Sequence, residues 1–182
     1  IFCELAQRES FWFDLLAADL NPFLREKSLP YAFPLDSDHM ESQGKIFSHV
    51  IDFRSRYTSV HSNGVAASAS ALARLNSMDE RTCRMMNLAG LIHDIGKLSI
   101  PREILEKPGP LSEKEYGLIK RHSYNSYLLL KPVAACAEIV RWISHHHERP
   151  NGQGYPFRLC DEQIGPEARL LAVADAISCG GK

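Results

Sequence analysis

The stretch LAGLIHDIGK, residues 88–97, places a histidine and an aspartate side by side in a segment that is otherwise largely apolar. Burying two such polar groups costs free energy unless something pairs with them. Adjacent residues of a helix point about 100° apart, so His93 and Asp94 could grip one metal ion from two directions. Lys97 lies one turn beyond His93, where it could reach an anion held at that metal. The alternative is a buried, hydrogen-bonded His–Asp pair beside a lysine.

Helical periodicity continues in both directions from this stretch. The predicted helices cover residues 4–20, 36–53, 58–75, 79–96, 112–131, 133–147 and 166–178. A capping box of Ser112 with Glu115 supports one of these starts. The small side chains of AASASALARL, residues 66–75, predict that a neighbouring helix approaches closely. No segment alternates polar and apolar residues as a strand would. The sequence therefore predicts an all-α fold.

The composition of the 182 residues limits the class of protein. Hydrophobic residues at 45% and charged residues at 24% are ordinary for a globular domain. The net charge of -1 gives no basic field for a nucleic-acid polymer. The five cysteines are scattered without a CxxC pair, which is typical of reduced thiols. No apolar run is long enough for a membrane segment and no signal peptide opens the chain, so we expect a cytoplasmic protein.

Further candidate metal ligands lie at helical positions elsewhere in the chain: His61, His122, His146, His147 and Asp175. Each alone has a structural explanation, as a surface histidine, a buried hydrogen-bond acceptor or a charged helix end. Together they resemble the ligand sets of di-metal sites, in which imidazole and carboxylate groups project from several helices of one bundle. No cysteine joins the set. Nitrogen and oxygen ligands favour iron or manganese, with zinc or nickel as alternatives.

Such a centre suits phosphodiester hydrolysis. Two metal ions about 3.5 to 4 Å apart clamp both the attacking and the leaving oxygen of an in-line phosphoryl displacement. They also lower the pKa of a bridging water, so that hydroxide exists at neutral pH.

Four segments carry a resemblance to a known family: HDIGK at 93–97, SIPREILEKPGPLSEKE at 99–115, IKRH at 119–122 and HHERPNGQGYP at 146–156. In this order and separation they resemble the HD-GYP domains, a subgroup of the HD metal-dependent phosphohydrolase superfamily. The resemblance covers 45–182, which we expect to be the catalytic domain after an N-terminal helical extension over 1–44. It implies a helical bundle with two or three metal ions. It also implies hydrolysis of the bacterial second messenger cyclic di-GMP to linear pGpG, and in many members on to GMP.

The resemblance implies roles for the individual residues. One metal would be held by His61, His93, Asp94 and Asp175. The other would be held by His122, His146 and His147, with Asp94 bridging the two. Lys97 would bind and polarise the scissile phosphate, which a hydroxide bridging the metals would attack.

A loop after the last two histidines completes the expected site. It contains Gly152, Gly154, Tyr155 and Pro156, which would flank the substrate pocket. In the family this loop is also proposed to meet partner proteins, including diguanylate cyclase domains. Glu148 is expected to orient its neighbours and not to bind metal.

Several positions depart from the family's pattern. Asn151 replaces the usual loop aspartate, although Asn-Gly still makes the turn. Ser123 and Ser126 stand where proline and glycine are usual. Tyr57 stands where some three-metal members have a glutamate, which favours two metal ions here. The family continues through more helix after Asp175, so its C-terminal helices are expected to be cut short in this chain.

Other functions remain open from the sequence. The substrate could be 3′3′-cyclic GMP-AMP or another nucleotide, because the motifs around the metals do not separate these. The domain could also be a non-catalytic sensor or adaptor that binds the nucleotide or a cyclase. Broken ligand positions would indicate that function, and here all of them are intact. A homodimer is neither required nor excluded.

Overall fold

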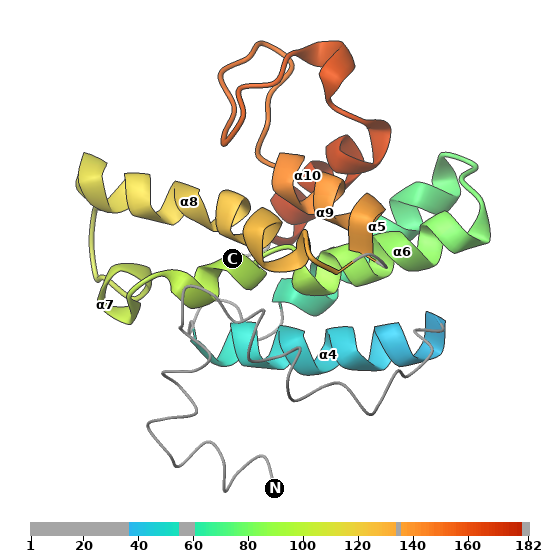
Figure 1. Ribbon diagram of the computed structural model, residues 1–182, viewed down its shortest axis with the longest axis horizontal. Helices are drawn as coiled ribbons and strands as arrows, with labels where there is room; N and C mark the ends of the chain where they lie inside the picture. Colours follow the sequence, from blue (N-terminus) through green and yellow to red (C-terminus); the bar gives the residue numbers. More distant parts are fainter. Residues whose placement is uncertain (1–36, 55–60, 134–135, 180–182) are drawn as a thin grey trace, which may run out of the picture. The chain divides into compact units, whose positions relative to one another are not determined.

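The computed structural model describes residues 37–54, 61–133 and 136–179, and all regular structure in this part of the chain is helical (Figure 1). Its α-helices are α4 (Ser37–Arg54), α5 (His61–Leu75), α6 (Glu80–Ile92), α7 (Arg102–Leu105), α8 (Glu113–Leu130), α9 (Ala137–His145) and α10 (Pro166–Cys179). Where the structure describes the connections, they contain the 3-10 helices η1 (Ile95–Ser99) and η3 (Asp161–Gln163). The predicted all-α fold is confirmed. The helix predicted over 4–20 lies outside the described residues.

Helices α5 and α6 form the centre of the core because their contact faces carry small side chains. Val65, Ala69 and Ala73 of α5 are completely buried, and α5 packs against both α6 and α10. A Cβ atom at Gly90 of α6 would lie 2.4 Å from the Cα atom of Ala66, so this approach requires glycine. The predicted close packing of the small-residue helix is confirmed. It brings the first turn of α5 near the end of α6.

The helix predicted over residues 79–96 ends earlier than expected. His93 caps α6 with φ -55° and ψ -33°, and Asp94 leaves the helix with φ -95° and ψ 11°. Lys97 N–H then donates to the carbonyl oxygen of Asp94 at 2.8 Å in η1. The prediction of one continuous helix through the His–Asp pair is therefore wrong. The pair lies at a break between two helices.

Contact with α8 causes this break. The amide of Gly96 donates a hydrogen bond to Ser126 Oγ at 2.9 Å, so it is not available to continue the helical ladder. A Cβ atom at Gly96 would lie 1.9 Å from the carbonyl oxygen of His122, which shows how tightly the two backbones meet. Ser126 Oγ also donates to the carbonyl oxygen of His93 at 3.3 Å. One buried serine thus ties the end of α6 and the start of η1 to α8.

The remaining helix bounds follow the local signals. The capping box of α8 is present, with Glu115 N–H donating to Ser112 Oγ at 3.3 Å and Ser112 N–H donating to Glu115 Oε2 at 2.7 Å. Helix α10 begins at Pro166 as predicted. Helix α9 is shorter than the predicted 133–147 and ends at His145, so the next two histidines follow the helix and do not belong to it.

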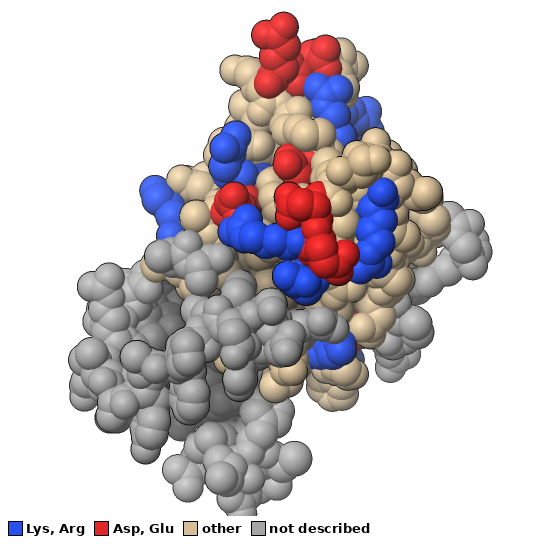
Figure 2. Space-filling view, turned by 90° about the vertical axis from the view of Figure 1, so that its right-hand side faces the viewer, with Lys and Arg blue, Asp and Glu red and all other residues tan. Residues whose placement is uncertain are grey.

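Helix α4 packs against α6 and η1. The predicted domain boundary between residues 44 and 45 falls within α4, and the separate extension over 1–44 stays a prediction because most of it lies outside the described residues. Among the described residues, none of the helices combines the length and apolar character that crossing a membrane requires. On the face shown in Figure 2, acidic and basic side chains are interspersed and do not gather by sign.

Candidate metal centre

Asp94 lies at the middle of the predicted centre, with only 2% of its surface exposed. Its two carboxylate oxygens face different partners. Oδ2 lies 3.3 Å from Nε2 of His93, and Oδ1 lies 3.4 Å from Nε2 of His122 on α8. Lys97 Nζ donates to Oδ2 at 2.5 Å. This arrangement is what a carboxylate that bridges two cations needs, because each oxygen has its own imidazole neighbour.

Three buried histidines share one hydrogen-bond pattern that fixes which ring nitrogen faces the centre. Each places Nδ1 within hydrogen-bond distance of the carbonyl oxygen three residues earlier, at 2.8 Å for His93, 2.7 Å for His122 and 2.5 Å for His146. A carbonyl oxygen only accepts, so in the neutral ring each Nδ1 carries the proton and each Nε2 presents a lone pair. Metal-binding histidines typically hold their second ring nitrogen in this way.

Two of these Nε2 atoms are buried without a hydrogen-bond partner among the described residues, those of His93 and His146. The carboxylate oxygens near His93 Nε2 lie close but do not meet hydrogen-bond geometry. Buried polar side-chain atoms are rarely left without a partner, so two such lone pairs in one place indicate a cation site. The chemistry of the donors, imidazole and carboxylate, fits a divalent transition metal.

The first of two clusters is formed where α5, α6 and α10 meet. His61, the first residue of α5, places Nε2 3.1 Å from Asp175 Oδ1 of α10. The same oxygen lies 3.8 Å from Nε2 of His93. Beside this cluster, Ser62 Oγ donates to the buried Asp52 Oδ1 at 2.8 Å, which ties α4 to the first turn of α5. The Ser62–Asp52 hydrogen bond thus fixes the turn that carries His61, and Asp175 contacts the His61 ring itself.

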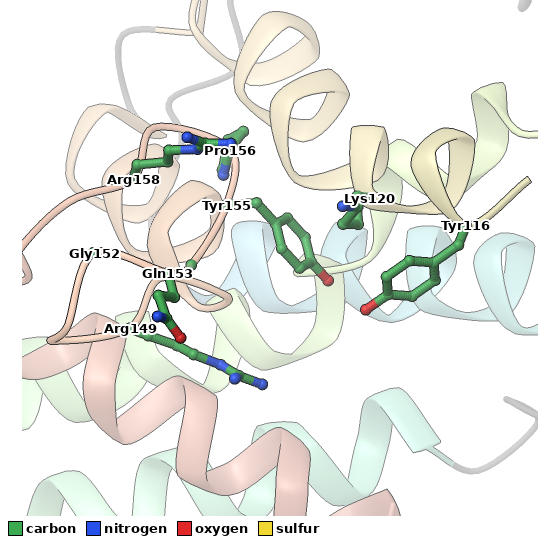
Figure 3. Close-up of a pocket in the computed structure, with 9 residues that line it drawn as sticks. Tyr116, Lys120, Arg149, Gly152, Gln153, Tyr155, Pro156 and Arg158 are labelled. Atoms are coloured by element: carbon green, nitrogen blue, oxygen red, sulfur yellow. The ribbon is translucent and has the colours of Figure 1, made fainter. Parts of the chain in front are cut away.

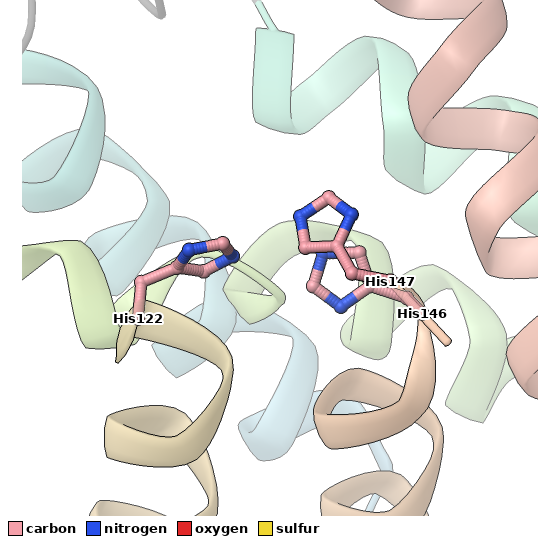
Figure 4. A group of neighbouring side chains, drawn as sticks. All are labelled: His122, His146 and His147. Atoms are coloured by element: carbon pink, nitrogen blue, oxygen red, sulfur yellow. The ribbon is translucent and has the colours of Figure 1, made fainter. Parts of the chain in front are cut away.

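The second cluster contains His122, His146 and His147 (Figure 4). His122 comes from α8 and the other two from the residues that directly follow α9, and their rings point toward one another. Their possible ligand atoms all lie within 4.8 Å of one another. The ring centroids of His122 and His147 are 5.0 Å apart and those of His146 and His147 3.9 Å.

All seven residues predicted as ligands fall in these neighbouring clusters, which also share members. His93 is grouped with His61 and Asp94 and also with His146 and Asp175. The metal-binding role of each residue stays a prediction. Cys179 was not predicted as part of the centre, yet its sulfur lies within 4.8 Å of ligand atoms of His61 and Asp175. Its spacing of four residues from Asp175 on one helix is the sequence signal that indicates it.

The electrostatics of the centre favour ionised carboxylates. Burial favours the neutral form of Asp94, but the neighbouring His93 and Lys97 outweigh it and hold the pKa of Asp94 well below its usual range. Burial likewise opposes the charge of Lys97, but Asp94 raises the pKa of this lysine, so it stays a cation. Burial is also outweighed at Asp175, where the hydrogen bond with His61 lowers the pKa.

Most of the histidines are held neutral. Burial and the neighbouring imidazole of His122 lower the pKa of His147 to about 4. Burial lowers the pKa of His146 well below its usual value, and it also lowers that of His122. At His93 burial acts in the same direction but is outweighed by Asp94 and Asp175, which raise its pKa. Neutral imidazoles beside ionised carboxylates are in the protonation states that metal binding requires.

The loop after α9 is organised by Glu148, which is buried. Its carboxylate accepts hydrogen bonds from the backbone N–H groups of Phe157 at 2.6 Å and Leu159 at 2.9 Å. Glu148 therefore orients the loop and not a histidine. A Cβ atom at Gly154 would lie 2.3 Å from the backbone nitrogen of Arg149, so the loop folds onto its own start only with glycine there.

The tip of this loop is a turn that begins at Asn151. The backbone N–H of Gln153 donates to Asn151 Oδ1 at 3.0 Å. Gly152 adopts a φ of 71°, in the left-handed region that suits glycine. The expectation that asparagine still makes the turn is confirmed. Tyr57, which stands where some three-metal members of the family have a glutamate, lies outside the described residues.

Comparison with known proteins agrees with this geometry. Residues 39–178 match the sequence model of the family described as "HD domain", and the chain belongs to this family. Within the family it belongs to the HD-GYP subgroup that its motifs predicted. The chain is 37% identical over 154 residues to a 3′3′-cGAMP-specific phosphodiesterase 1 of Vibrio cholerae, covering 85% of this chain and 34% of that protein.

Two further relatives carry the other substrate in their names. The chain is 47% identical over 120 residues to a cyclic di-GMP phosphodiesterase of Pseudomonas aeruginosa, covering 65% of this chain and 29% of the relative. It is 36% identical over 130 residues to a cyclic di-GMP phosphodiesterase response regulator of Xanthomonas campestris, with 70% and 34% covered. The chain thus spans about a third of the length of these curated relatives.

Proposed function

We propose that residues 45–182 form the catalytic domain of a metal-dependent phosphodiesterase that hydrolyses cyclic di-GMP to pGpG, GMP or both. The observation that carries the proposal is the position of Asp94 between two histidine-rich clusters, with one carboxylate oxygen toward each. Relatives named for cyclic di-GMP hydrolysis support the choice of substrate.

The residues present fit two divalent metal ions, iron or manganese, with zinc or nickel as alternatives. One ion would be held by His61, His93, Asp94 and Asp175. The other would be held by His122, His146 and His147, with Asp94 shared. When bound, such ions lower the pKa of water and neutralise charge that develops on a phosphate.

The chain's own groups would bind and shield the substrate. Lys97, with 24% of its side chain exposed and a raised pKa, is a cation at the edge of the centre, and it would bind a nonbridging oxygen of the scissile phosphate. Asp94 orients Lys97 through their ion pair. The ring of Tyr155 covers His147, with the centroids 4.8 Å apart, and would limit access of bulk water from the loop side.

The second candidate substrate is 3′3′-cyclic GMP-AMP, which is favoured by the name of the Vibrio cholerae relative that covers 85% of this chain. Hydrolysis rates of the protein with each cyclic dinucleotide, measured side by side under the same metal, decide between the two. A higher kcat/KM for 3′3′-cyclic GMP-AMP would move the assignment to that substrate. If the protein binds a cyclic dinucleotide but hydrolyses neither with iron, manganese, zinc or nickel, the domain is a sensor or adaptor.

The direct test of the proposal is Asp94→Asn, which keeps the shape of the side chain and removes its charge. We expect metal content and turnover of cyclic di-GMP to fall together, turnover by roughly 100-fold or more, because losing a group that orients a metal site already costs up to that factor. Metal content is measured by elemental analysis and turnover by chromatography of the products. Glu162→Gln, an exposed carboxylate on η3, is the matched control. Full turnover in Asp94→Asn would refute the mechanism.

The loop that contains Gly152, Gly154, Tyr155 and Pro156 would also contact a diguanylate cyclase domain, as the family resemblance implies. A homodimer is compatible with this arrangement. Size-exclusion chromatography of the protein alone and with a cyclase domain tests both interactions.

A further inference from the structure

A pocket of about 600 Å³ opens between α8 and the loop that follows α9 (Figure 3). We call it the loop pocket and define it by Tyr116, Lys120, Arg149, Gln153, Tyr155 and Arg158. None of the described residues that line it is acidic. The predicted loop residues form one wall, whereas Tyr116 and Lys120 come from α8 and Arg149 from the start of the loop. No role in the reaction described above has been given to these last three.

The loop pocket begins where the metal centre ends, because Tyr155 belongs to both. One side of the Tyr155 ring faces the second histidine cluster, with centroid distances of 4.8 Å to His147 and 6.4 Å to His122. Lys120 Nζ lies 6.0 Å from the centroid of the same ring. A ligand that reaches from the metal centre past Tyr155 therefore enters the loop pocket.

The side chain of Lys120 is placed between two aromatic rings. Its Nζ lies 5.1 Å from the ring centroid of Tyr116, one helical turn earlier on α8, in addition to its contact with Tyr155. In Figure 3 the hydroxyl groups of the two tyrosines point toward one another near Lys120. The cation is thus held by ring faces and not by a carboxylate, which leaves its donors available for an anion.

Two arginines add to the positive charge. Figure 3 shows Arg149 reaching along the opposite side of the loop pocket, and Arg158 lies near Pro156. Within the part of the chain that the structure describes, Lys120, Arg149 and Arg158 form no ion pair with an acidic side chain. Cations that line one pocket without acidic partners, beside aromatic rings, match a phosphate with an attached base, since charge-assisted hydrogen bonds hold the phosphate and the base stacks on a ring.

We propose that the loop pocket binds the second half of the cyclic dinucleotide, the nucleotide whose phosphodiester is not being cleaved. This inference rests on the proposed function and adds the residues that grip the rest of the substrate. Lys120 and Arg149 donate to the uncleaved phosphate, and the attached purine stacks on the exposed part of Tyr155 or Tyr116. The two phosphates of a cyclic dinucleotide belong to one ring of covalent bonds, so with one phosphate at the metal centre the other must lie in an adjoining site, and the loop pocket adjoins the centre at Tyr155.

The test is equilibrium binding of cyclic di-GMP to the metal-free protein, measured by titration calorimetry. Lys120→Gln and Arg149→Gln each remove one cation from the loop pocket, and each is expected to raise Kd by roughly ten-fold or more, because a charge-assisted hydrogen bond is lost. Lys114→Gln on α8 and Arg141→Gln on α9 remove exposed cations outside the pocket and serve as matched controls. Equal Kd values in the pocket variants and the controls would overturn the proposal, as would a wild-type protein that shows no binding.

A second measurement separates this inference from the proposed function. With metal-loaded protein, we expect Lys120→Gln to raise KM for cyclic di-GMP by roughly ten-fold, and to affect hydrolysis of the small diester bis(4-nitrophenyl) phosphate far less. Absence of turnover under every metal, together with weaker binding by Lys120→Gln, would refute the proposed phosphodiesterase activity and support the binding role of the loop pocket. Turnover of cyclic di-GMP with the same KM in Lys120→Gln and in wild type would support the proposed activity and refute the binding role of the loop pocket.

Discussion

At the scale of single residues, the candidate centre depends on side chains that are held in one orientation before any ligand arrives. In each of His93, His122 and His146, one ring nitrogen forms a hydrogen bond with the backbone carbonyl oxygen three residues earlier. The nitrogen that remains is directed inward. A site whose groups are already oriented loses less conformational entropy when it binds a ligand. The same burial that orients the rings also makes protonating them unfavourable.

That burial predicts how the metal-free protein responds to acid. His122, His146 and His147 have lowered pKa values in the fold, about 4 for His147, so they stay neutral where the unfolded chain takes up protons. Below the unfolded pKa of about 6.5 the unfolded state binds more protons, and stability falls with pH down to about 4. His93 has a raised pKa, so its contribution to stability changes with pH in the opposite direction. Three histidines with lowered pKa values outweigh this single contribution.

The measurement is the Tm of metal-free protein in buffers of equal ionic strength between pH 7 and pH 4. We expect Tm to decrease steadily toward acid through this window. A Tm that is constant or rises on acidification would contradict the burial of neutral histidines.

At the scale of elements, the break between α6 and η1 brings the His–Asp pair to the centre. The sequence indicates that these two residues are buried and polar, but it does not indicate the break, because the break comes from a contact with α8 about 30 residues later. For the same reason Lys97 contacts Asp94 and does not lie one turn above His93 on a common helix. Local periodicity reports local structure, and here a tertiary hydrogen bond overrides it.

A glycine substitution tests this contact. In Gly96→Ala the new Cβ would lie 1.9 Å from the carbonyl oxygen of His122, a backbone atom that cannot move away easily. We expect the free energy of unfolding to decrease by about 1–3 kcal/mol, as for overpacked cores, and metal content to fall because Asp94 moves away from His122. Chemical denaturation and elemental analysis measure the two effects.

Gly117→Ala is the matched control for that substitution. Gly117 lies within α8, and among the described residues no atom beyond its own stretch of helix lies within 4 Å of the position that an added Cβ would take. Alanine is therefore expected to stabilise this helix by about 0.5–1 kcal/mol. Equal stability changes at the two glycines would show that the approach of η1 to α8 does not matter.

At the scale of the whole molecule, the candidate ligands come from α5, the α6–η1 break, α8, the residues directly after α9, and α10. The clustering of the candidate ligands could be predicted because each is a polar residue at an unusual position in an apolar or helical context, and because the motifs resemble a family. One wall of the loop pocket was predicted from the loop motif, but the opposite wall could not be predicted in this way. Lys120, Tyr116 and Arg149 are ordinary surface residues in the sequence, and only the folding of the loop against α8 brings them together.

Ligands from so many elements meet only in the folded state, so metal binding should stabilise the fold as a whole. Metal at 100 times its Kd is expected to add about 2.7 kcal/mol, which raises Tm by several degrees. Thermal unfolding with manganese and with a chelator measures this difference, and Asp94→Asn is expected to reduce it. A Tm that chelation leaves unchanged would show that no ion links these helices.

The central claim is that the side chains around Asp94 surround a pair of cations, and anomalous X-ray diffraction from crystals of the metal-loaded protein tests it most directly. We predict two anomalous peaks, one among His61, His93 and Asp175 and one among His122, His146 and His147, each within coordination distance of a different Asp94 oxygen. Peaks only at the protein surface, or none in crystals soaked with manganese or iron, would contradict the account.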